Sequence, residues 1–108
     1  DPNKSVSDIT LACFGLSYKP NIDDLRESPA LNITKELSNI GFSKLMAVEP
    51  NINALPEGLD KIELTPVEEA KEKADIILLL VDHKEFKETD IKGNKNIIDT
   101  RGIWLKRR

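Results

Sequence analysis

Ile76-Ile77-Leu78-Leu79-Leu80-Val81 is the longest apolar stretch of this 108-residue chain, and it is bounded by Asp75 and Asp82. It is far shorter than the roughly 20 residues that a membrane-spanning helix needs. A run of this length between charged residues is typical of a strand that is buried on both faces. A second run of the same kind, Ile9 to Phe14, ends at Gly15. Two such strands indicate the centre of a parallel sheet covered by helices.

Helical patterns lie between the apolar runs. Ser28 can cap a helix that has Pro29 in its first turn and ends at Gly41. Thr65-Pro66 opens a second helix, which continues to Lys73. The inner face of the first helix is expected to carry four apolar residues, Leu31, Ile33, Leu37 and Ile40. Further strands are expected at residues 45–48, 61–64 and 96–99, with a short helical turn at residues 84–88.

This alternation predicts an α/β fold, with a Rossmann-like, doubly wound and mainly parallel sheet of five strands in the order 3-2-1-4-5. We assign residues 1–8 to a linker or the end of a preceding element, and residues 9–108 to one domain. The net charge of −3 argues against nucleic acid as a partner, and no apolar run suits a membrane. The single cysteine, Cys13, fits a reducing, cytoplasmic compartment.

The segment between the first strand and the first helix is unusually long. It has about 12 residues, whereas an ordinary strand-to-helix loop has about 2–6. In the predicted order it lies beside residues 82–86 and 99–104, where the strand order reverses and doubly wound sheets bind their ligands. The loop carries donors that suit a phosphate or diphosphate: Lys19, Arg26, the Ser28 hydroxyl and the first amides of the helix.

Less specific interpretations of these residues stand beside that one. The loop could be a solvated segment in which Asp23 or Asp24 pairs with Arg26. Gly15 lacks the further glycines of a dinucleotide fingerprint, so a cofactor pyrophosphate is not expected at the first strand. A lone histidine such as His83 is more often structural or exposed than a ligand contact, and no second histidine accompanies it to hold a metal. Cys13 is expected to pack in the core.

The long loop is also where a family resemblance lies. Its sequence is Phe14-Gly15-Leu16-Ser17-Tyr18-Lys19-Pro20-Asn21-Ile22-Asp23-Asp24-Leu25-Arg26-Glu27-Ser28-Pro29-Ala30. This stretch resembles the C-terminal domain signature of the UDP-glucose/GDP-mannose dehydrogenase family. Three further stretches resemble the branch that acts on UDP-N-acetyl-D-mannosamine: Val48 to Asn51, Leu80 to His83 with Phe86, and Asp99 to Gly102 with Trp104.

The resemblance covers almost the whole chain, and it implies a place in a longer enzyme. Enzymes of this family oxidise the C6 alcohol of a nucleotide sugar to a carboxylate in two steps and use two NAD. An N-terminal Rossmann domain holds NAD, a central helical segment builds a homodimer or a larger assembly, and the C-terminal domain binds the UDP-sugar. The resemblance thus implies a cytoplasmic UDP-sugar 6-dehydrogenase that supplies surface polysaccharide synthesis.

Site residues are carried over from the family by position. Tyr18 and Lys19 match residues that contact UDP, and Arg101 matches an arginine at the substrate diphosphate. Arg26 matches an arginine that faces the NAD side of the cleft between domains, and His83 falls in the substrate cleft. The catalytic cysteine of the family lies upstream of this signature, as do its lysine and asparagine. The chain by itself is therefore expected to be inactive.

Two other classes of protein share parts of this pattern. A receiver module also alternates strands and helices, but it needs an aspartate after the third strand and a lysine after the fifth. Leu64-Thr65 and Asp99-Thr100 stand there instead. A small α/β interaction module without a catalytic role is the second alternative. It would not require Lys19, Arg26 and Arg101 to converge, and titration with UDP distinguishes it.

Overall fold

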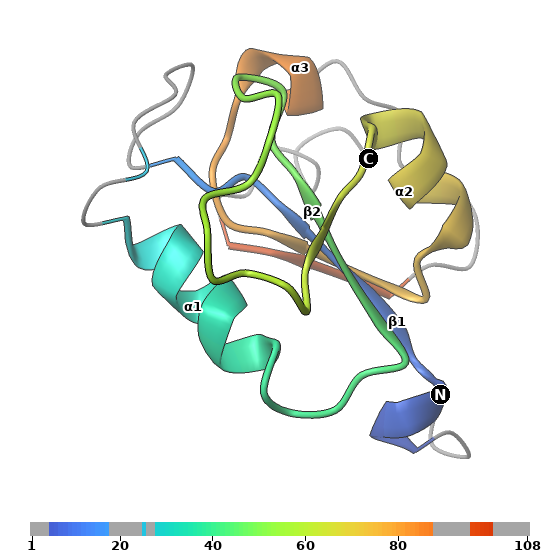
Figure 1. Ribbon diagram of the computed structural model, residues 1–108. Coiled ribbons are helices and arrows are strands. Elements are labelled where there is room, and N and C mark those ends of the chain that lie inside the picture. Colours follow the sequence, from blue (N-terminus) through green and yellow to red (C-terminus); the bar gives the residue numbers. More distant parts are fainter. Residues whose placement is uncertain (1–4, 18–24, 26–27, 88–95, 101–108) are drawn as a thin grey trace.

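The computed structural model describes residues 5–17, 25, 28–87 and 96–100, and it contains a five-stranded sheet (Figure 1). The strands are β1 (Thr10–Phe14), β2 (Lys44–Val48), β3 (Glu63–Leu64), β4 (Ile76–Leu79) and β5 (Asn96–Asp99). Their order is β3-β2-β1-β4-β5, and every neighbouring pair is parallel. The predicted fold class and strand order are confirmed.

Helices cover both faces of this sheet. The helical elements are η1 (Val6–Asp8), α1 (Pro29–Leu37), α2 (Val67–Lys73) and α3 (Lys84–Lys87). In Figure 1, α1 lies on the opposite side of the sheet from α2 and α3. Within the ranges that the structure describes, no helix is both long and apolar enough to cross a membrane. The layered arrangement leaves the ends of the strands as the places where loops meet.

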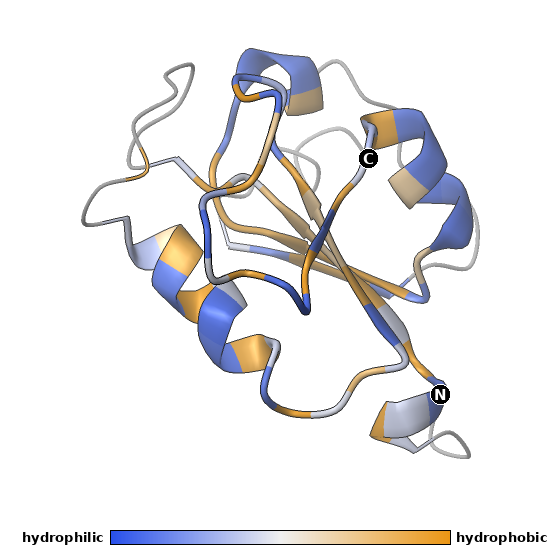
Figure 2. Ribbon diagram, in the orientation of Figure 1, coloured by the Kyte–Doolittle hydropathy of each residue, from blue (hydrophilic) through white to orange (hydrophobic). Residues whose placement is uncertain are grey.

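Side chains of each central strand alternate between two apolar layers. Leu11 and Cys13 of β1 point into the layer beneath α1, whereas Ala12 and Phe14 point into the layer beneath α2 and α3. This period of two is the geometry of any strand, and here both faces are buried. Figure 2 shows the strands as strongly hydrophobic and α2 as mainly hydrophilic. Helix α2 contributes little more than Ala70 to the interior.

The cap of α1 is as expected, but its inner face is not. Ser28 accepts a hydrogen bond from the amide of Leu31, and Pro29 lies in the first turn. However, Ile33 is 40% exposed and Ile40 is 54% exposed, so their placement on the inner face was wrong. A helix turns about 100° per residue, so Ile33 points about 200° away from Leu31. The buried face is formed by Ala30, Leu31 and Thr34.

Strand boundaries also differ from the predicted ones. The third strand begins at Glu63 rather than at residue 61, and the fourth ends at Leu79 rather than at Val81. Leu80 and Val81 are still buried, but Ile76 and Leu78 are only partly buried. The strand ends early because the amides of Leu80 and Val81 both turn to the carbonyl of Phe14, at 2.9 and 3.3 Å. An apolar run thus predicts burial better than it predicts strand length.

Gly15 ends β1 in a conformation that requires glycine. Its φ is +100°, and its amide donates to the carbonyl of Val48 at 2.8 Å. A Cβ at this position would lie 2.6 Å from Cβ of Val81 and 2.8 Å from its amide nitrogen. The close contact with backbone atoms cannot be relieved by turning a side chain. Gly15 therefore allows β1 and the end of β4 to approach closely.

We expect Gly15→Ala to lower the free energy of unfolding by about 2–5 kcal/mol, the sum of the left-handed backbone cost and overpacking. Gly58→Ala is the matched control, because its φ is +86° but nothing lies within 4 Å of the added Cβ. It should cost only the backbone part, about 1 kcal/mol. Urea denaturation of both variants measures the difference. Equal losses would show that the contact with Val81 is unimportant.

Candidate functional site

The carboxyl ends of three strands meet at one edge of the sheet. Phe14, the last residue of β1, is in register with Val48 of β2 and Leu79 of β4. The chain runs from β1 toward β2 and β3 on one side, and β4 and β5 lie on the other. The order therefore reverses between β1 and β4, which is where doubly wound sheets bind ligands.

Glu49, the first residue after β2, places a buried carboxylate at this edge. Its Oε1 accepts from the amides of Leu16 at 2.8 Å and Ser17 at 3.0 Å, and it lies 2.8 Å from Nε2 of His83. Its Oε2 accepts from both the amide and the side-chain Nδ2 of Asn51, each at 3.1 Å. The side chains of Glu49 and His83 are fully buried. One carboxylate thus joins the ends of β1, β2 and β4.

The surroundings of Glu49 favour its charged form. Burial by itself would raise the pKa of this carboxyl, because a dry site disfavours charge. Donation from His83 and from the amides of Leu16 and Asn51 acts the other way, and together these contacts hold the pKa below its ordinary value of 4.5. An ionised Glu49 accepts hydrogen bonds at both oxygens. Nε2 of His83 therefore carries the ring hydrogen and donates a hydrogen bond to Oε1.

His83 lies at the predicted edge, but beneath the surface. Its Nε2 also lies 3.2 Å from Oγ of Ser17, and its Nδ1 lies 3.4 Å from Nδ2 of Asn51. In a serine hydrolase, the hydroxyl and the carboxylate occupy opposite nitrogens of the imidazole. Here Ser17 and Glu49 approach the same nitrogen, so the group is not arranged to activate Ser17 as a nucleophile. The ring also packs against Phe86, with centroids 5.4 Å apart.

Ser28 closes the base of the long loop. Its hydroxyl donates to the carbonyl of Leu16 at 2.6 Å and accepts from the amide of Leu31 at 3.2 Å. Ser28 is only 1% exposed, so its hydroxyl is used within the protein and is not offered to a phosphate. The two ends of the loop are thereby held together, 12 residues apart in sequence. The residues at the two ends of the loop, Leu16 and Ser28, are thus fixed to each other and shielded from water.

Four of the predicted site residues, Tyr18, Lys19, Arg26 and Arg101, lie outside the described residues, as does Trp104. Two of their chain neighbours are placed at the carboxyl edge. Ser17, which precedes Tyr18, is bound to Glu49, and Thr100, which precedes Arg101, donates its hydroxyl to the carbonyl of Leu79 at 2.6 Å. The structure therefore places the attachment points of two predicted contact residues at this edge.

Cys13 is enclosed in the core, as predicted. It is 0% exposed, and burial raises the pKa of its thiol to about 11, although a hydrogen bond with Thr34 acts in the other direction. A thiol in such a site is neutral and inaccessible, which is the opposite of a reactive cysteine. Within the described part of the chain, no group of three or more His, Cys, Asp or Glu could hold a metal ion.

A dinucleotide does not fit the turn after β1. A cofactor pyrophosphate at a Rossmann turn needs open space beside a glycine and a helix that starts at once. Around Gly15 that space is filled by Val81, and α1 begins only at Pro29. In the first turn of α1, the amide of Leu31 is already bound to Ser28. This edge is therefore not built as an NAD cradle of the usual kind.

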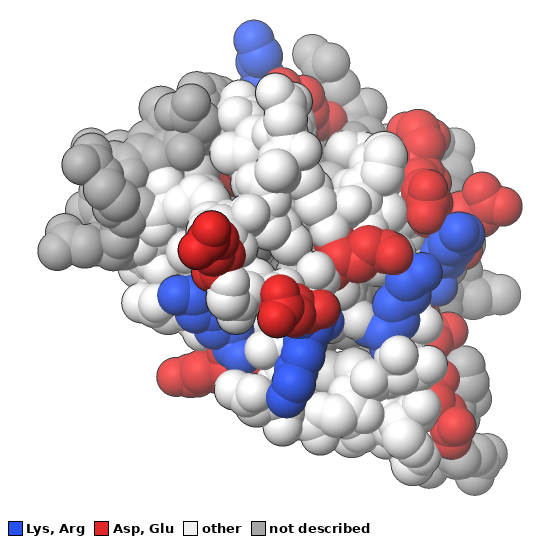
Figure 3. All heavy atoms as spheres, viewed as in Figure 1, with Lys and Arg blue, Asp and Glu red and all other residues white. Residues whose placement is uncertain are grey.

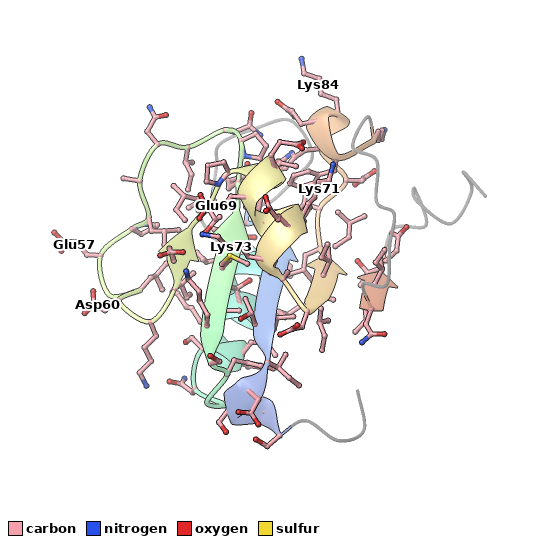
Figure 4. All side chains as sticks on the ribbon, turned by 90° about the vertical axis from the view of Figure 1, so that its right-hand side faces the viewer. Glu57, Asp60, Glu69, Lys71, Lys73 and Lys84 are labelled. Carbon is pink, nitrogen blue, oxygen red and sulfur yellow. The ribbon has the colours of Figure 1, made fainter. Side chains whose placement is uncertain are left out.

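Other surfaces of the described chain carry weaker signs of a site. Figure 4 shows Glu69, Lys71 and Lys73 on the outer side of α2, and exposed pairs of this kind are worth little energy. On the face shown in Figure 3, acidic and basic side chains alternate. A hollow of about 260 Å³ lies beside Lys44 and Lys61, at the amino end of β2 and thus at the opposite edge from Glu49.

The importance of Glu49 and Asn51 could not be recognised from composition or periodicity. One usable signal was present, because a glutamate that directly follows the apolar run Leu45–Val48 must either reach solvent or find donors. Nothing in the sequence said which of these two outcomes applies. The donors come from residues 16–17 and 83, which are distant in sequence and become neighbours only through the strand order.

The lowered pKa of Glu49 predicts a loss of stability in acid. Because the carboxyl has a lower pKa in the folded chain than in the unfolded chain, its contribution is complete well above pH 4.5 and is lost as the pH falls through the folded value. We expect Glu49→Gln to lower the free energy of unfolding at pH 7 by about 2–5 kcal/mol, since buried donors lose their acceptor. Its stability should also change less between pH 7 and pH 3.5 than that of the wild type.

Glu57→Gln is the control, because Glu57 is exposed on a surface loop (Figure 4). Urea denaturation at the two pH values gives the comparison. This variant should follow the wild type at both. If Glu49→Gln and the wild type lose the same stability in acid, the buried carboxylate is not the group that titrates.

Comparison with known proteins gives the context of this site. Residues 12–106 match the UDP binding domain of the UDP-glucose/GDP-mannose dehydrogenase family. An NDP-N-acetyl-D-galactosaminuronic acid dehydrogenase of Ralstonia solanacearum is 47% identical over 100 residues, which are 91% of this chain and 24% of that protein. A UDP-N-acetyl-D-mannosamine dehydrogenase of Salmonella typhi is 43% identical over 105 residues, 94% of this chain and 25% of that protein.

Solved structures agree with these sequence matches. A UDP-D-ManNAc dehydrogenase from Pyrococcus horikoshii superposes with a TM-score of 0.72 at 29% identity, over 94% of this chain and 24% of that one. A UDP-glucose dehydrogenase from Pyrobaculum islandicum has a TM-score of 0.79 at 21% identity, over 93% and 23%, and this likeness shows the fold alone. The chain thus spans about a quarter of the length of its relatives. This chain belongs to the UDP-glucose/GDP-mannose dehydrogenase family and corresponds to its UDP binding domain.

Proposed function

We propose that this chain is the C-terminal, substrate-binding domain of an NAD-dependent UDP-sugar 6-dehydrogenase. The observation that carries the proposal is the long loop at the point where the strand order reverses, with a base closed by Ser28 and fixed by Glu49. Such a base fixes the points at which the loop leaves the sheet, and groups that are fixed before a ligand binds lose less entropy on binding. Family membership makes the UDP part of a nucleotide sugar the fitting ligand.

Each predicted site residue has its own proposed role. Lys19 and Arg101 supply charge-assisted hydrogen bonds to the diphosphate, and Tyr18 contacts the nucleotide. Arg26 faces the NAD side of the cleft between this domain and the remainder of the enzyme. His83 contributes from beneath the surface, through Ser17 and Glu49. NAD supplies the hydride acceptor when bound, and it is held mainly by an upstream domain.

UDP-N-acetyl-D-mannosamine is the proposed sugar nucleotide. Relatives with this substrate in their name are 41–43% identical to the chain, and a relative named NDP-N-acetyl-D-galactosaminuronic acid dehydrogenase is 47% identical. The names share an N-acetylated sugar nucleotide, which is the substrate class that we propose. The enzyme would act in the cytoplasm as a homodimer or larger assembly, and its uronic acid product would serve surface polysaccharide synthesis.

Titration of the ¹⁵N-labelled chain with UDP should shift amide resonances at the carboxyl edge, including those of Ser17, Asn51 and Thr100. Resonances on the outer side of α2 around Lys73 should stay in place, because that helix covers a face of the sheet (Figure 4). Binding should be weak, with a dissociation constant of about a millimolar, since other parts of the enzyme are absent. Shifts on α2 alone, or none at all, would favour an interaction module that binds no nucleotide.

Lys19→Ala should weaken UDP binding about tenfold, because one charge-assisted contact to phosphate is worth about 1.4 kcal/mol or more. In the full-length enzyme the same change should mainly raise the KM for the UDP-sugar, since the diphosphate does not react. Steady-state kinetics with the sugar nucleotide varied at saturating NAD makes this measurement. A large fall in kcat with unchanged KM would assign Lys19 to the chemical step instead.

The chain alone should produce no NADH from UDP-N-acetyl-D-mannosamine and NAD. Oxidation of the aldehyde intermediate through a thioester needs an activated cysteine, and Cys13 is buried with a raised pKa. Absorbance of NADH is the readout, and Cys13→Ala in the full-length enzyme is the companion test. That variant should keep most of its activity. Turnover by the purified chain, beyond that of a mock purification, would contradict this division of labour.

A further inference from the structure

The carboxylate of Glu49, at the end of β2, binds the backbone at the start of the long loop. Its Oε1 accepts from two consecutive amides, those of Leu16 and Ser17, at 2.8 and 3.0 Å. Successive amides that point to one anion fix the backbone at both residues. Leu16 is 0% exposed and Ser17 is 1% exposed, so water does not compete for these bonds.

The carboxylate is in turn held in place from the other two strand ends. His83, four residues beyond the end of β4, donates to the same Oε1 at 2.8 Å. Asn51, three residues beyond the end of β2, donates twice to Oε2. Five donors surround a group that has two oxygens and no proton, so the carboxylate has a single favourable orientation.

The five hydrogen bonds to Glu49, called the Glu49 clamp below, lie at the start of the long loop. Their position can therefore affect ligand binding by that loop. Ser17 is the last described residue before Tyr18, and consecutive Cα atoms lie about 3.8 Å apart. The direction in which the backbone leaves Ser17 therefore sets where Tyr18 and Lys19 begin. Ser28 closes the other side of the loop base through the carbonyl of Leu16. Leu16 is thus held at its amide by Glu49 and at its carbonyl by Ser28.

We propose that Glu49, oriented by His83, is a positioning residue for substrate: it fixes the backbone at Leu16 and Ser17 and so presents Tyr18 and Lys19 to the diphosphate of the UDP-sugar. This inference rests on the proposed function, and it makes His83 a positioning residue as well, because His83 orients Glu49. Neither side chain touches the substrate in this arrangement. The effect of both reaches the ligand through the loop.

The test compares two replacements of His83 in the 108-residue chain. His83→Leu removes the donor to Oε1, whereas His83→Gln keeps an N–H near the position of Nε2. His83→Leu should weaken UDP binding about five- to tenfold, the usual effect of losing a hydrogen bond to a charged group. His83→Gln should stay within about twofold of the wild type. The shift of amide resonances of the ¹⁵N-labelled chain during titration with UDP measures both, because it follows binding in the millimolar range.

Coupling to Lys19 separates positioning from a general loss of stability. If His83 acts through the loop, His83→Leu should cost clearly less in a Lys19→Ala background than in the wild type, because one of the two side chains that it positions is gone. In an Arg101→Ala background its cost should remain about five- to tenfold, since Arg101 follows β5 and not this loop. Glu57→Gln, on an exposed loop, is the neutral control.

Folding is checked by the amide spectrum, in which resonances of β1 and β2 should persist and those of Leu16 and Ser17 should move. If His83→Leu does not fold, Asn51→Ala is the second variant, because Asn51 is only partly buried and its side chain supports Glu49 at Oε2. It should weaken UDP binding about threefold, and less so without Lys19.

Three outcomes are distinct. Folded variants that bind UDP as the wild type does would overturn the positioning role and leave the proposed function intact. Equal losses of UDP affinity for His83→Leu in the Lys19→Ala and Arg101→Ala backgrounds would show that Glu49 and His83 only stabilise the fold. A wild-type chain that does not bind UDP in titration, while its spectrum shows a folded domain, would remove the proposed function and this inference with it.

Discussion

A buried carboxylate has to be satisfied by donors, and this requirement organises the carboxyl edge of the sheet. The cost of removing a charge from water is several kcal/mol, so a dry Glu49 is stable only with partners on both oxygens. Those partners come from three separate strand ends, through Leu16 and Ser17, Asn51 and His83. Each of these segments can satisfy Glu49 only when β1, β2 and β4 end at the same level. The charge therefore couples the three connections to one another.

At the same edge the backbones of β1 and the end of β4 approach each other closely. Gly15 brings β1 against Val81 in a space that a Cβ would fill, and the amide of Gly15 bonds to Val48. A dinucleotide turn uses such a glycine to admit a pyrophosphate, but here protein atoms occupy the place. The fold is that of a nucleotide-binding domain, and its first turn is packed shut.

Much of this architecture could be predicted from the sequence, and the reasons are local. The apolar runs at Ile9–Phe14 and Ile76–Val81 indicated the central strands because burial on both faces requires them to be apolar. Ser28 and Pro29 marked the start of α1 because capping needs only neighbouring residues. Ile33 is an exception, because its hydrophobicity predicts burial but the helical period puts it on the outer side of α1.

The sequence predicted an edge of the sheet for the site but not the contacts that are found there. Loop length and strand order pointed to the carboxyl ends of β1 and β4, where Ser17, Glu49 and His83 meet. The clamp depends on contacts between residues 32 to 34 positions apart, and nothing in a local pattern records them. The sequence likewise predicts His83 in the substrate cleft, whereas its side chain is fully buried and lies against Glu49 and Ser17. A carboxylate held by donors from three strand ends leaves the backbone at Leu16 and Ser17 little freedom, and a backbone that is fixed before a ligand arrives loses less entropy on binding.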